Sequence, residues 1–180
     1  MNKGQAHPST TLYESLITEA FMDLIQTKKI ESITISELCQ KADVSRRTFY
    51  RHFNTKEDIV SCYMYKIMSE LALVLEPMVK DNDPYSFVST FFTFMLPYTK
   101  LIAHLQQNDL VSIMFSCYIQ CLTPLSYPPT LSDVHASSLD CKLAYMLGGL
   151  WSLLTFWIMN DCKQTPQQLA DIVSSEAFLN

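Results

Sequence analysis

Residues 34–60 read TISELCQKADVSRRTFYRHFNTKEDIV and predict two short helices that meet at a sharp turn, followed by the start of a third helix. Thr34 begins a capping box of the form T-x-x-E at the first of these helices. Asp43 suits the turn, because aspartate tolerates the left-handed backbone conformation better than most residues. Ser45 is placed to cap the second helix, which is predicted to run from Arg46 to Phe53.

The second helix of this segment separates apolar from polar side chains. Phe49 and Phe53 are four residues apart and are predicted to face inward. The outward face then carries basic and hydroxyl-bearing residues: Arg46, Arg47, Thr48, Tyr50 and His52. Such a face fits the DNA major groove, because guanine accepts two hydrogen bonds from arginine and a threonine methyl packs on the thymine methyl. A merely solvated charged face is the alternative, but the caps, the turn and the inward aromatic residues agree with DNA binding.

The segment resembles the DNA-binding motif of the TetR (tetracycline repressor) family of transcriptional regulators. The shared pattern consists of Thr34, Ala42–Ser45, Thr48–Phe53 and Lys56–Ile59, with Asp43 where glycine is commoner. The resemblance implies a double-stranded DNA operator as partner, with phosphate contacts from Thr34, Tyr50, His52 and Lys56. It implies base reading mainly by Arg46, Arg47 and Thr48, and the capping residue Ser45 completes the predicted DNA-binding set.

Length and composition predict an all-α protein with one or two small domains. The chain has 180 residues, of which 48% are hydrophobic, with three glycines and no alternating strand pattern. We expect a three-helix DNA-binding domain over residues 1–54 and a helical regulatory and dimerisation domain over residues 55–180. A helix over residues 9–29 should pack on the motif, and a long helix from residue 55 to about residue 80 should join the domains. The apolar stripe predicted for the first helix consists of Leu12, Leu16, Ala20, Met22, Leu24 and Ile25.

The net charge of −5 does not oppose DNA binding, because the acidic excess lies outside the motif. Residues 1–60 contain eight Lys or Arg and eight Asp or Glu, whereas residues 61–180 contain five and ten. Arg46, Arg47 and Arg51 lie close to Lys56, and this local field matters more than the net charge. Because the basic cluster is modest, we expect tight DNA binding only from a dimer.

Residues 143–159 form a stretch of seventeen residues without charge. Its length is at the lower limit for a bilayer and small residues interrupt it, so we interpret it as a core or subunit-interface helix and not as a membrane span. Together with Thr165-Pro166, it resembles the C-terminal domain common among TetR-type regulators of Firmicutes, in which the last two long helices pair with their two-fold mates. The resemblance implies a homodimer, with an interface formed by Tyr145, Gly148, Gly149, Ser152 and Trp157.

The same resemblance implies a ligand pocket in the C-terminal domain, whose filling by an unknown small-molecule effector releases the DNA. The candidate lining is Phe91, Phe94, Met95, Tyr98, Met114 and Tyr118, for which plain core packing is the alternative. A dimer would place its two recognition helices about 34 Å apart on a near-palindromic operator, and repression is the family default. A co-regulator that binds a protein partner is the second possibility. A closed pocket would favour a ligand, whereas an exposed apolar groove would favour a protein.

No catalytic or cofactor motif is evident. The chain lacks a glycine-rich phosphate loop and G-x-S-x-G, its four histidines are scattered, and no metal or cofactor site is expected. The six cysteines suit a reducing compartment: Cys39, Cys62, Cys117, Cys121, Cys141 and Cys162. Cys117 and Cys121 lie one helical turn apart and could bind metal or sense oxidants, although core packing is favoured. Residues 1–10 lack an apolar segment, so we expect no secretory signal and a cytoplasmic location.

Overall fold

The computed structural model describes residues 8–126 and 133–174, and the side-chain surroundings of residues 12–125 and 144–174. These ranges are helical and contain no strand, which confirms the predicted all-α class. The chain divides into two compact units, Met1–Tyr63 with His104–Ile113 and Met64–Ala103 with Met114–Asn180. The first unit therefore runs past the predicted boundary at residue 54 and takes in a short segment from the middle of the chain.

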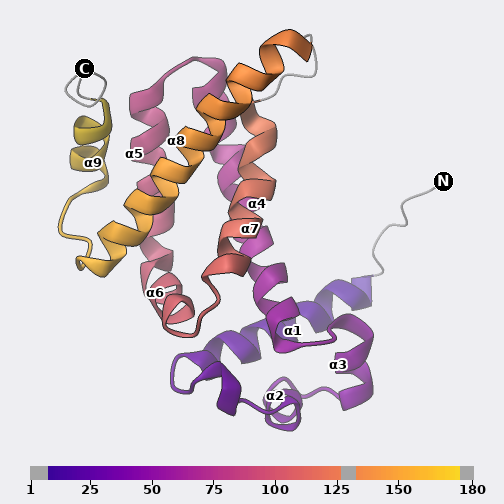
Figure 1. The fold of residues 1–180 in the computed structure, drawn as a ribbon. Helices are drawn as coiled ribbons and strands as arrows, with labels where there is room; N and C mark the ends of the chain where they lie inside the picture. Colours follow the sequence, from indigo (N-terminus) through magenta and orange to yellow (C-terminus); the bar gives the residue numbers. More distant parts are fainter. Residues whose placement is uncertain (1–7, 127–132, 175–180) are drawn as a thin grey trace. The chain divides into compact units, whose positions relative to one another are not determined.

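The first unit contains α1 (Pro8–Ile25), the 3₁₀ turn η1 (Ile30–Ser32), α2 (Ile35–Lys41) and α3 (Arg46–His52), as Figure 1 shows. Helix α1 packs on both α2 and α3, and the latter two also contact each other. Six apolar side chains at the centre of this unit are at most 1% exposed: Ile17, Phe21, Ile25, Ile33, Leu38 and Phe49. A small but complete core thus holds α3 in place.

The buried face of α1 differs from the predicted stripe. Leu12 and Leu16 are 57% and 37% exposed, whereas Ile17 and Phe21 are fully buried. Both pairs have a spacing of four residues, so helical periodicity alone fits either face. The prediction was wrong for Leu12 and Leu16 because the packing of α2 and α3 decides which apolar stripe is covered. The helix also ends at Ile25, earlier than predicted.

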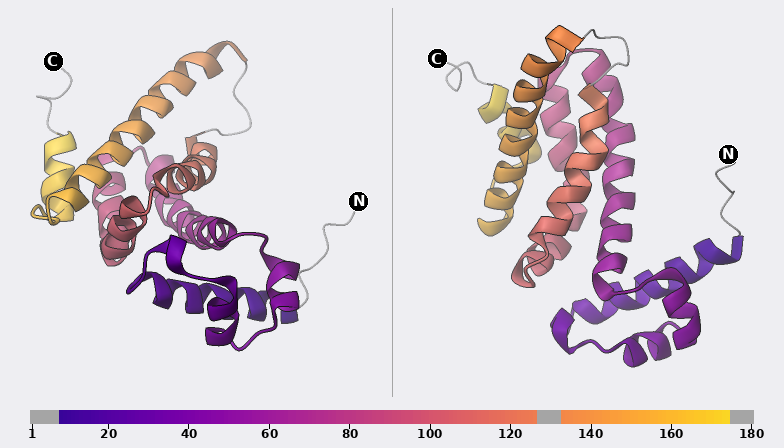
Figure 2. Two further views of the ribbon diagram at one scale, coloured as in Figure 1. Left: turned by 60° about the horizontal axis from the view of Figure 1, so that its bottom comes forward. Right: turned by 45° about the vertical axis from the view of Figure 1, so that its right-hand side comes forward.

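The long helix α4 (Lys56–Lys80) begins in the first unit and continues into the second. The second unit further contains α5 (Pro84–Met95), η2 (Leu96–Tyr98), most of α7 (Val111–Leu122), η3 (Thr123–Ser126), α8 (Asp133–Met159) and α9 (Pro166–Ser174). Pro97 predicts a kink or a split in a helix over residues 85–106. This is confirmed, because α5 is followed by η2 and then by α6 (Thr99–Gln107). Helix α9 packs along α5, and the two lie side by side in both views of Figure 2. Pro128-Pro129 predicts a loop over residues 124–133, which falls mostly on residues 127–132, outside the described part of the chain.

The sequence predicts helix starts at Pro84 and at the capping box Thr165-Pro166-Gln167-Gln168, and both are confirmed by their caps. Asp83 Oδ1 accepts a hydrogen bond of 3.0 Å from Ser86 N, and Pro84 occupies the first position of α5. At α9, Thr165 Oγ1 accepts from Gln168 N at 3.2 Å, and Thr165 N donates to Gln168 Oε1 at 2.8 Å. These reciprocal bonds form the capping box that the sequence predicts.

An aromatic cluster forms the centre of the second unit. The Tyr118 ring lies 5.3 Å from that of Trp151 and 6.1 Å from that of Phe91, and Phe92 meets Trp157 edge to face at 5.3 Å. The Tyr118 hydroxyl donates a 2.9 Å hydrogen bond to the carbonyl of Leu147, and burial raises the pKa of this phenol. The cluster joins α5, α7 and α8 into one core.

Candidate nucleic-acid interface

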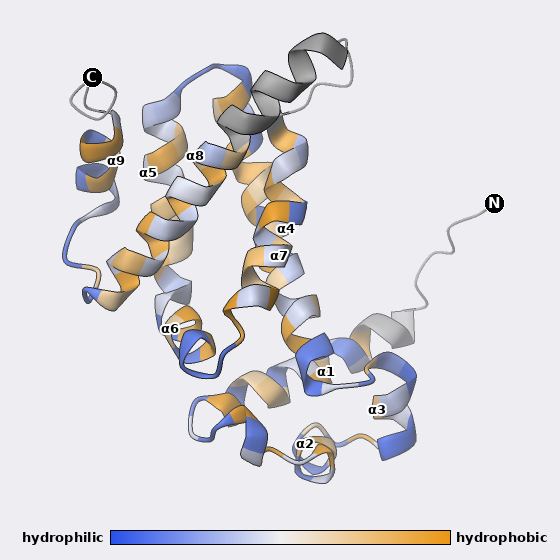
Figure 3. Ribbon diagram, viewed as in Figure 1, coloured by the Kyte–Doolittle hydropathy of each residue, from blue (hydrophilic) through white to orange (hydrophobic). Residues whose placement is uncertain are grey.

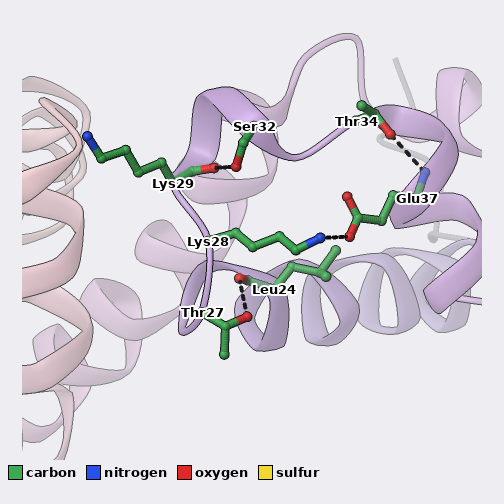
Figure 4. Close-up of polar contacts among 7 residues, drawn as sticks. All are labelled: Leu24, Thr27, Lys28, Lys29, Ser32, Thr34 and Glu37. Atoms are coloured by element: carbon green, nitrogen blue, oxygen red, sulfur yellow. Dashed lines mark hydrogen bonds and ion pairs between the residues drawn. The ribbon is translucent and has the colours of Figure 1, made fainter.

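The two short helices of the first unit begin at the predicted caps. Thr34 Oγ1 accepts from Glu37 N at 3.1 Å, and Ser45 Oγ accepts from Thr48 N at 3.0 Å. Asp43 adopts a φ of 52°, the left-handed conformation that the sharp turn requires. The carboxylate of Glu37 pairs with the ammonium of Lys28 on the preceding connection (Figure 4), and this contact lowers the pKa of Glu37.

Helix α3 turns its charged residues outward. Phe49 is fully buried and Phe53 is 4% exposed, as predicted. Arg46 and Arg47 are exposed at the start of the helix, and the Tyr50 side chain on the same helix is 50% exposed. Thr48 is half-buried, and Ser45 and Thr34 are exposed at the two caps. Hydrophilic residues accordingly dominate α3 and its flanks in Figure 3.

His52 does not face outward, so this part of the prediction is wrong. Its side chain is only 3% exposed, and Nδ1 lies 3.4 Å from Glu14 Oε1 on α1. Arg51 Nε donates to His52 Nε2 at 3.4 Å, and the Arg51 guanidinium lies 5.7 Å from the centre of the Tyr13 ring. The physical reason is the helical spacing: His52 follows Phe49 by three residues and shares the side of α3 that packs on α1.

Lys56 also points into the protein. Its ammonium donates to the carbonyl oxygens of Ile30 and Ile33, the latter at 2.8 Å. Six of the eight predicted DNA-binding residues therefore lie at the caps of α2 and α3 or on α3 itself, while His52 and Lys56 make contacts within the first unit. The spacing of His52 from Phe49 could have indicated its inward position, but the sequence did not reveal the partners of His52 and Lys56, because both contacts join residues distant in sequence.

Comparison with known proteins identifies this helical arrangement. A family model described as "Bacterial regulatory proteins, tetR family" matches residues 17–61, a range that includes the caps, the turn and α3. The HTH-type dhaKLM operon transcriptional activator DhaS of Lactococcus lactis subsp. lactis (strain IL1403) is 31% identical over 72 residues. That match covers 40% of this chain and 35% of the relative. Residues 17–61 of this chain therefore match the TetR family. The match assigns this part of the chain to a family of bacterial regulatory proteins.

Two solved structures share the fold of this chain. The fatty acid degradation regulator FadR from Bacillus halodurans superposes with a TM-score of 0.60 at 17% identity, covering 94% of each chain. The dihydroxyacetone kinase operon activator DhaS superposes with a TM-score of 0.52 at 18% identity, covering 89% of this chain and 91% of the other. At these identities the likeness concerns the fold, which includes the helical C-terminal part.

The residues predicted to line a ligand pocket lie mainly in the packed core. Phe91, Met95, Met114 and Tyr118 have no exposed surface. The rings of Phe94 and Tyr98, both half-buried, lie 5.8 Å apart. A hollow of about 960 Å³ lies elsewhere in the second unit, and none of these six residues lines it. Its lining comes from the end of α4, the start of α5, α8 and α9, and includes Met78, Phe87, Tyr145, Gly149, Phe156 and Ile172.

The hollow shares four residues with the predicted dimer interface: Tyr145, Gly148, Gly149 and Ser152. Tyr145 is 74% exposed, and exposed apolar side chains continue along α8 and α9: Met146, Phe156, Met159, Ile172 and Val173. We call this set, with the four shared residues, the α8–α9 face; apolar colours mark the later turns of α8 in Figure 3. The prediction that Trp157 belongs to the dimer interface was wrong. Trp157 is 1% exposed and its Nε1 donates to the carbonyl of Gln164, so it belongs to the core of the second unit.

The cysteines and the apolar helix α8 add no further site within the described residues. Cys39 and Cys117 are buried, and burial raises the pKa of both thiols, which makes them less reactive. No group of three potential metal-ligating His, Cys, Asp or Glu residues occurs in the described part of the chain. None of the helices described there has the length and apolar character of a membrane span. The side chain of Cys141 lies outside the described range.

Proposed function

We propose that this regulator binds a near-palindromic operator as a homodimer in the cytoplasm, with α3 as the reading helix. The observation that carries the proposal is the exposed Arg46–Arg47 pair at the start of a capped helix whose opposite side is buried. Arginine forks match guanine in the major groove. Thr34, Ser45 and Tyr50 are exposed beside this pair and supply hydroxyls for phosphate contacts, while the half-buried Thr48 presents a methyl group for thymine.

The proposed homodimer uses the α8–α9 face. A monomer that leaves Tyr145, Phe156 and Met159 more than 60% exposed presents an apolar surface that water solvates poorly. A two-fold interface is self-complementary, so one such face suffices for both partners. The small residues Gly148, Gly149 and Ser152 support close approach of the two copies. The same symmetry would present two α3 helices to successive major grooves about 34 Å apart.

Release of the operator by a small apolar effector is the proposed regulation, and the hollow on the α8–α9 face is the available space for it. A specific observation favours the second candidate, a co-regulator that binds a protein partner: the lining residues Tyr145 and Phe156 are 74% and 61% exposed, so the hollow opens at the surface. An apolar fluorescent dye distinguishes the two. A dye signal that persists when the protein is fully dimeric shows that a small apolar molecule still enters the hollow and supports the effector, whereas a signal lost on dimerisation shows that a protein surface fills the hollow and counts against the effector.

Operator recognition is tested by selecting genomic DNA with the purified protein and then measuring the affinity of Arg47→Ala. We expect a loss of about 1–3 kcal/mol on the selected site and a smaller loss on random DNA. Lys80→Ala is the matched control, because it removes one exposed positive charge from the second unit. Equal losses on selected and random DNA would contradict base reading by Arg47. A reporter gene under the selected site then decides between repression and activation, since the relative DhaS is described as an activator.

A further inference from the structure

The 3₁₀ turn η1 connects α1 to α2 and receives a cap from a distant part of the chain. The first amide groups of a helical turn have no partner within it, and the preceding residue, Lys29, supplies no side-chain cap. The amide of Ile30 instead donates a 3.1 Å hydrogen bond to Oδ1 of Asn108, which lies 78 positions later in the sequence. Both residues belong to the same compact unit.

Asn108 is itself held firmly at the end of α6. Its Nδ2 donates a 2.8 Å hydrogen bond to the carbonyl of His104 in the last turn of the helix. Asp109, the next residue, adopts a φ of 59°, and the amide of Leu110 bonds back to the carbonyl of Leu105. This is the Schellman end of a helix, which fixes the backbone of Asn108. The amide side chain therefore joins α6 to η1 through two hydrogen bonds.

The other side of η1 is held by Lys56 at the start of α4. Its ammonium binds the carbonyl oxygens of Ile30 and Ile33, so both polar backbone groups of Ile30 are bound by side chains from distant elements. Ile33 directly precedes Thr34, the cap of α2. The contacts of η1 with Asn108 and Lys56 therefore also fix the position of the first residues of α2.

The remaining bonds of the connection between α1 and α2 make it stiff. Figure 4 shows Thr27 bonded to Leu24, Ser32 bonded to the carbonyl of Lys29, and Lys28 paired with Glu37 of α2. The side chain of Lys29 points away from the other labelled residues. A displacement of η1 would therefore move the start of α2 rather than be absorbed by a loose linker.

We propose that Asn108 and Lys56 are positioning residues for DNA binding, which act through η1 on Thr34 and α2. Lys56 then aligns the DNA-contacting elements and is not itself a phosphate ligand. The inference rests on the proposed operator binding, but its structural part concerns the amide of Ile30 and is measurable without DNA.

The direct test is amide hydrogen exchange at Ile30, followed by NMR in the full-length protein. Asn108→Ala removes both hydrogen bonds, whereas Asn108→Asp keeps an oxygen acceptor for Ile30 and loses only the donor to His104. We expect exchange at Ile30 to be roughly twofold to tenfold faster in Asn108→Ala and close to the unsubstituted rate in Asn108→Asp. An unchanged rate in Asn108→Ala, with the fold intact by circular dichroism, overturns the inference.

The functional test measures operator affinity over a range of salt concentrations. We expect Asn108→Ala and Lys56→Met to bind the operator roughly twofold to tenfold more weakly with an unchanged salt slope, and Asn108→Asp to restore the affinity. Lys29→Met is the matched control, because it removes an exposed lysine from the same connection whose side chain does not cap η1 and points away from the other labelled residues. It should leave the affinity unchanged.

Two results overturn the inference in this second test. A salt slope shallower by about one unit in Lys56→Met identifies Lys56 as a phosphate ligand. Full operator affinity in Asn108→Ala, despite faster exchange at Ile30, shows that η1 does not position the reader. If the unsubstituted protein selects no DNA at all, the proposed function fails, while the exchange measurement at Ile30 still decides the structural part independently.

Discussion

Gly149 lies on the exposed side of α8, and Gly149→Leu should affect folding and association in opposite directions. A Cβ atom built at Gly149 meets no heavy atom within 4 Å, so the isolated chain has room for a side chain there. Glycine inside a helix is less favourable than a good helix former by about 1 kcal/mol. We therefore expect the folded monomer to gain about this amount in its free energy of unfolding.

Association should respond in the opposite way if the α8–α9 face is the dimer interface. Added methylenes in a close-packed contact cost about 1–3 kcal/mol. A two-fold interface contains the substitution twice, so the dimer loses about 2–6 kcal/mol. This loss corresponds to a dimer dissociation constant that is roughly thirtyfold to twenty-thousandfold higher.

Sedimentation velocity across a protein concentration series measures the dimer constant, and thermal unfolding of the dissociated chain measures the folding effect. Ser116→Leu is the control, because it adds the same side chain at an exposed position of α7. A Gly149→Leu protein that dimerises as tightly as the unsubstituted one would refute the proposed interface. A protein that loses both dimerisation and thermal stability would show that the substitution disrupts the chain itself.

Three further substitutions test the local structure. Ser45→Ala removes the cap of α3 and should destabilise the protein by about 1 kcal/mol in urea unfolding, whereas Ser45→Gly should cost only a few tenths; equal losses would speak against a capping role. Tyr118→Phe leaves the carbonyl of Leu147 without its 2.9 Å donor and should cost about 1–3 kcal/mol, and an unchanged denaturation midpoint would contradict this. The amides of Thr55 and Asn54 lower the pKa of Asp58, so its stabilisation is present above the unfolded-state pKa and is lost as pH falls through the lower folded-state value. The stability difference between the unsubstituted protein and Asp58→Asn should therefore shrink below about pH 3.8; a constant difference across that range would exclude the carboxylate as its source.

The parts of the fold that depend on neighbours in sequence were predictable. The caps at Thr34 and Ser45, the left-handed turn at Asp43 and the inward Phe49 all follow from residues at most four positions apart. Each uses a specific property of its residue type, such as a side-chain oxygen at a cap or tolerance of a positive φ. The two short helices and the turn between them could therefore be predicted from the sequence alone.

The errors concern contacts between distant segments. Leu12 and Ile17 both lie on regular apolar stripes, and only the packing of α2 and α3 selects the second. His52 is polar and close to the exposed Arg47 in sequence, which favoured an outward position. Its side chain instead lies against Glu14 on α1 and is buried. In the second unit, the amphipathic side chain of Tyr118 is compatible with a pocket wall and with a packed core, so the residue type alone could not decide between them. The ring contacts with Phe91 and Trp151 place Tyr118 in the core.

The DNA-binding unit is only modestly basic, so tight operator binding should depend on the dimer. One further experiment separates the effect of dimerisation from the effect of base reading. When two weak readers are joined, the second binds at a high effective concentration, so the pair can bind far more tightly than either alone. Loss of association by Gly149→Leu should then weaken operator binding at low protein concentration and be overcome at concentrations that restore the dimer. Arg47→Ala changes the contact of each copy with DNA, so raising the protein concentration should restore occupancy without restoring discrimination between operator and random DNA. If Gly149→Leu also lost that discrimination, the α8–α9 face would influence base reading directly, and the division of roles between α3 and the dimer face would have to be abandoned.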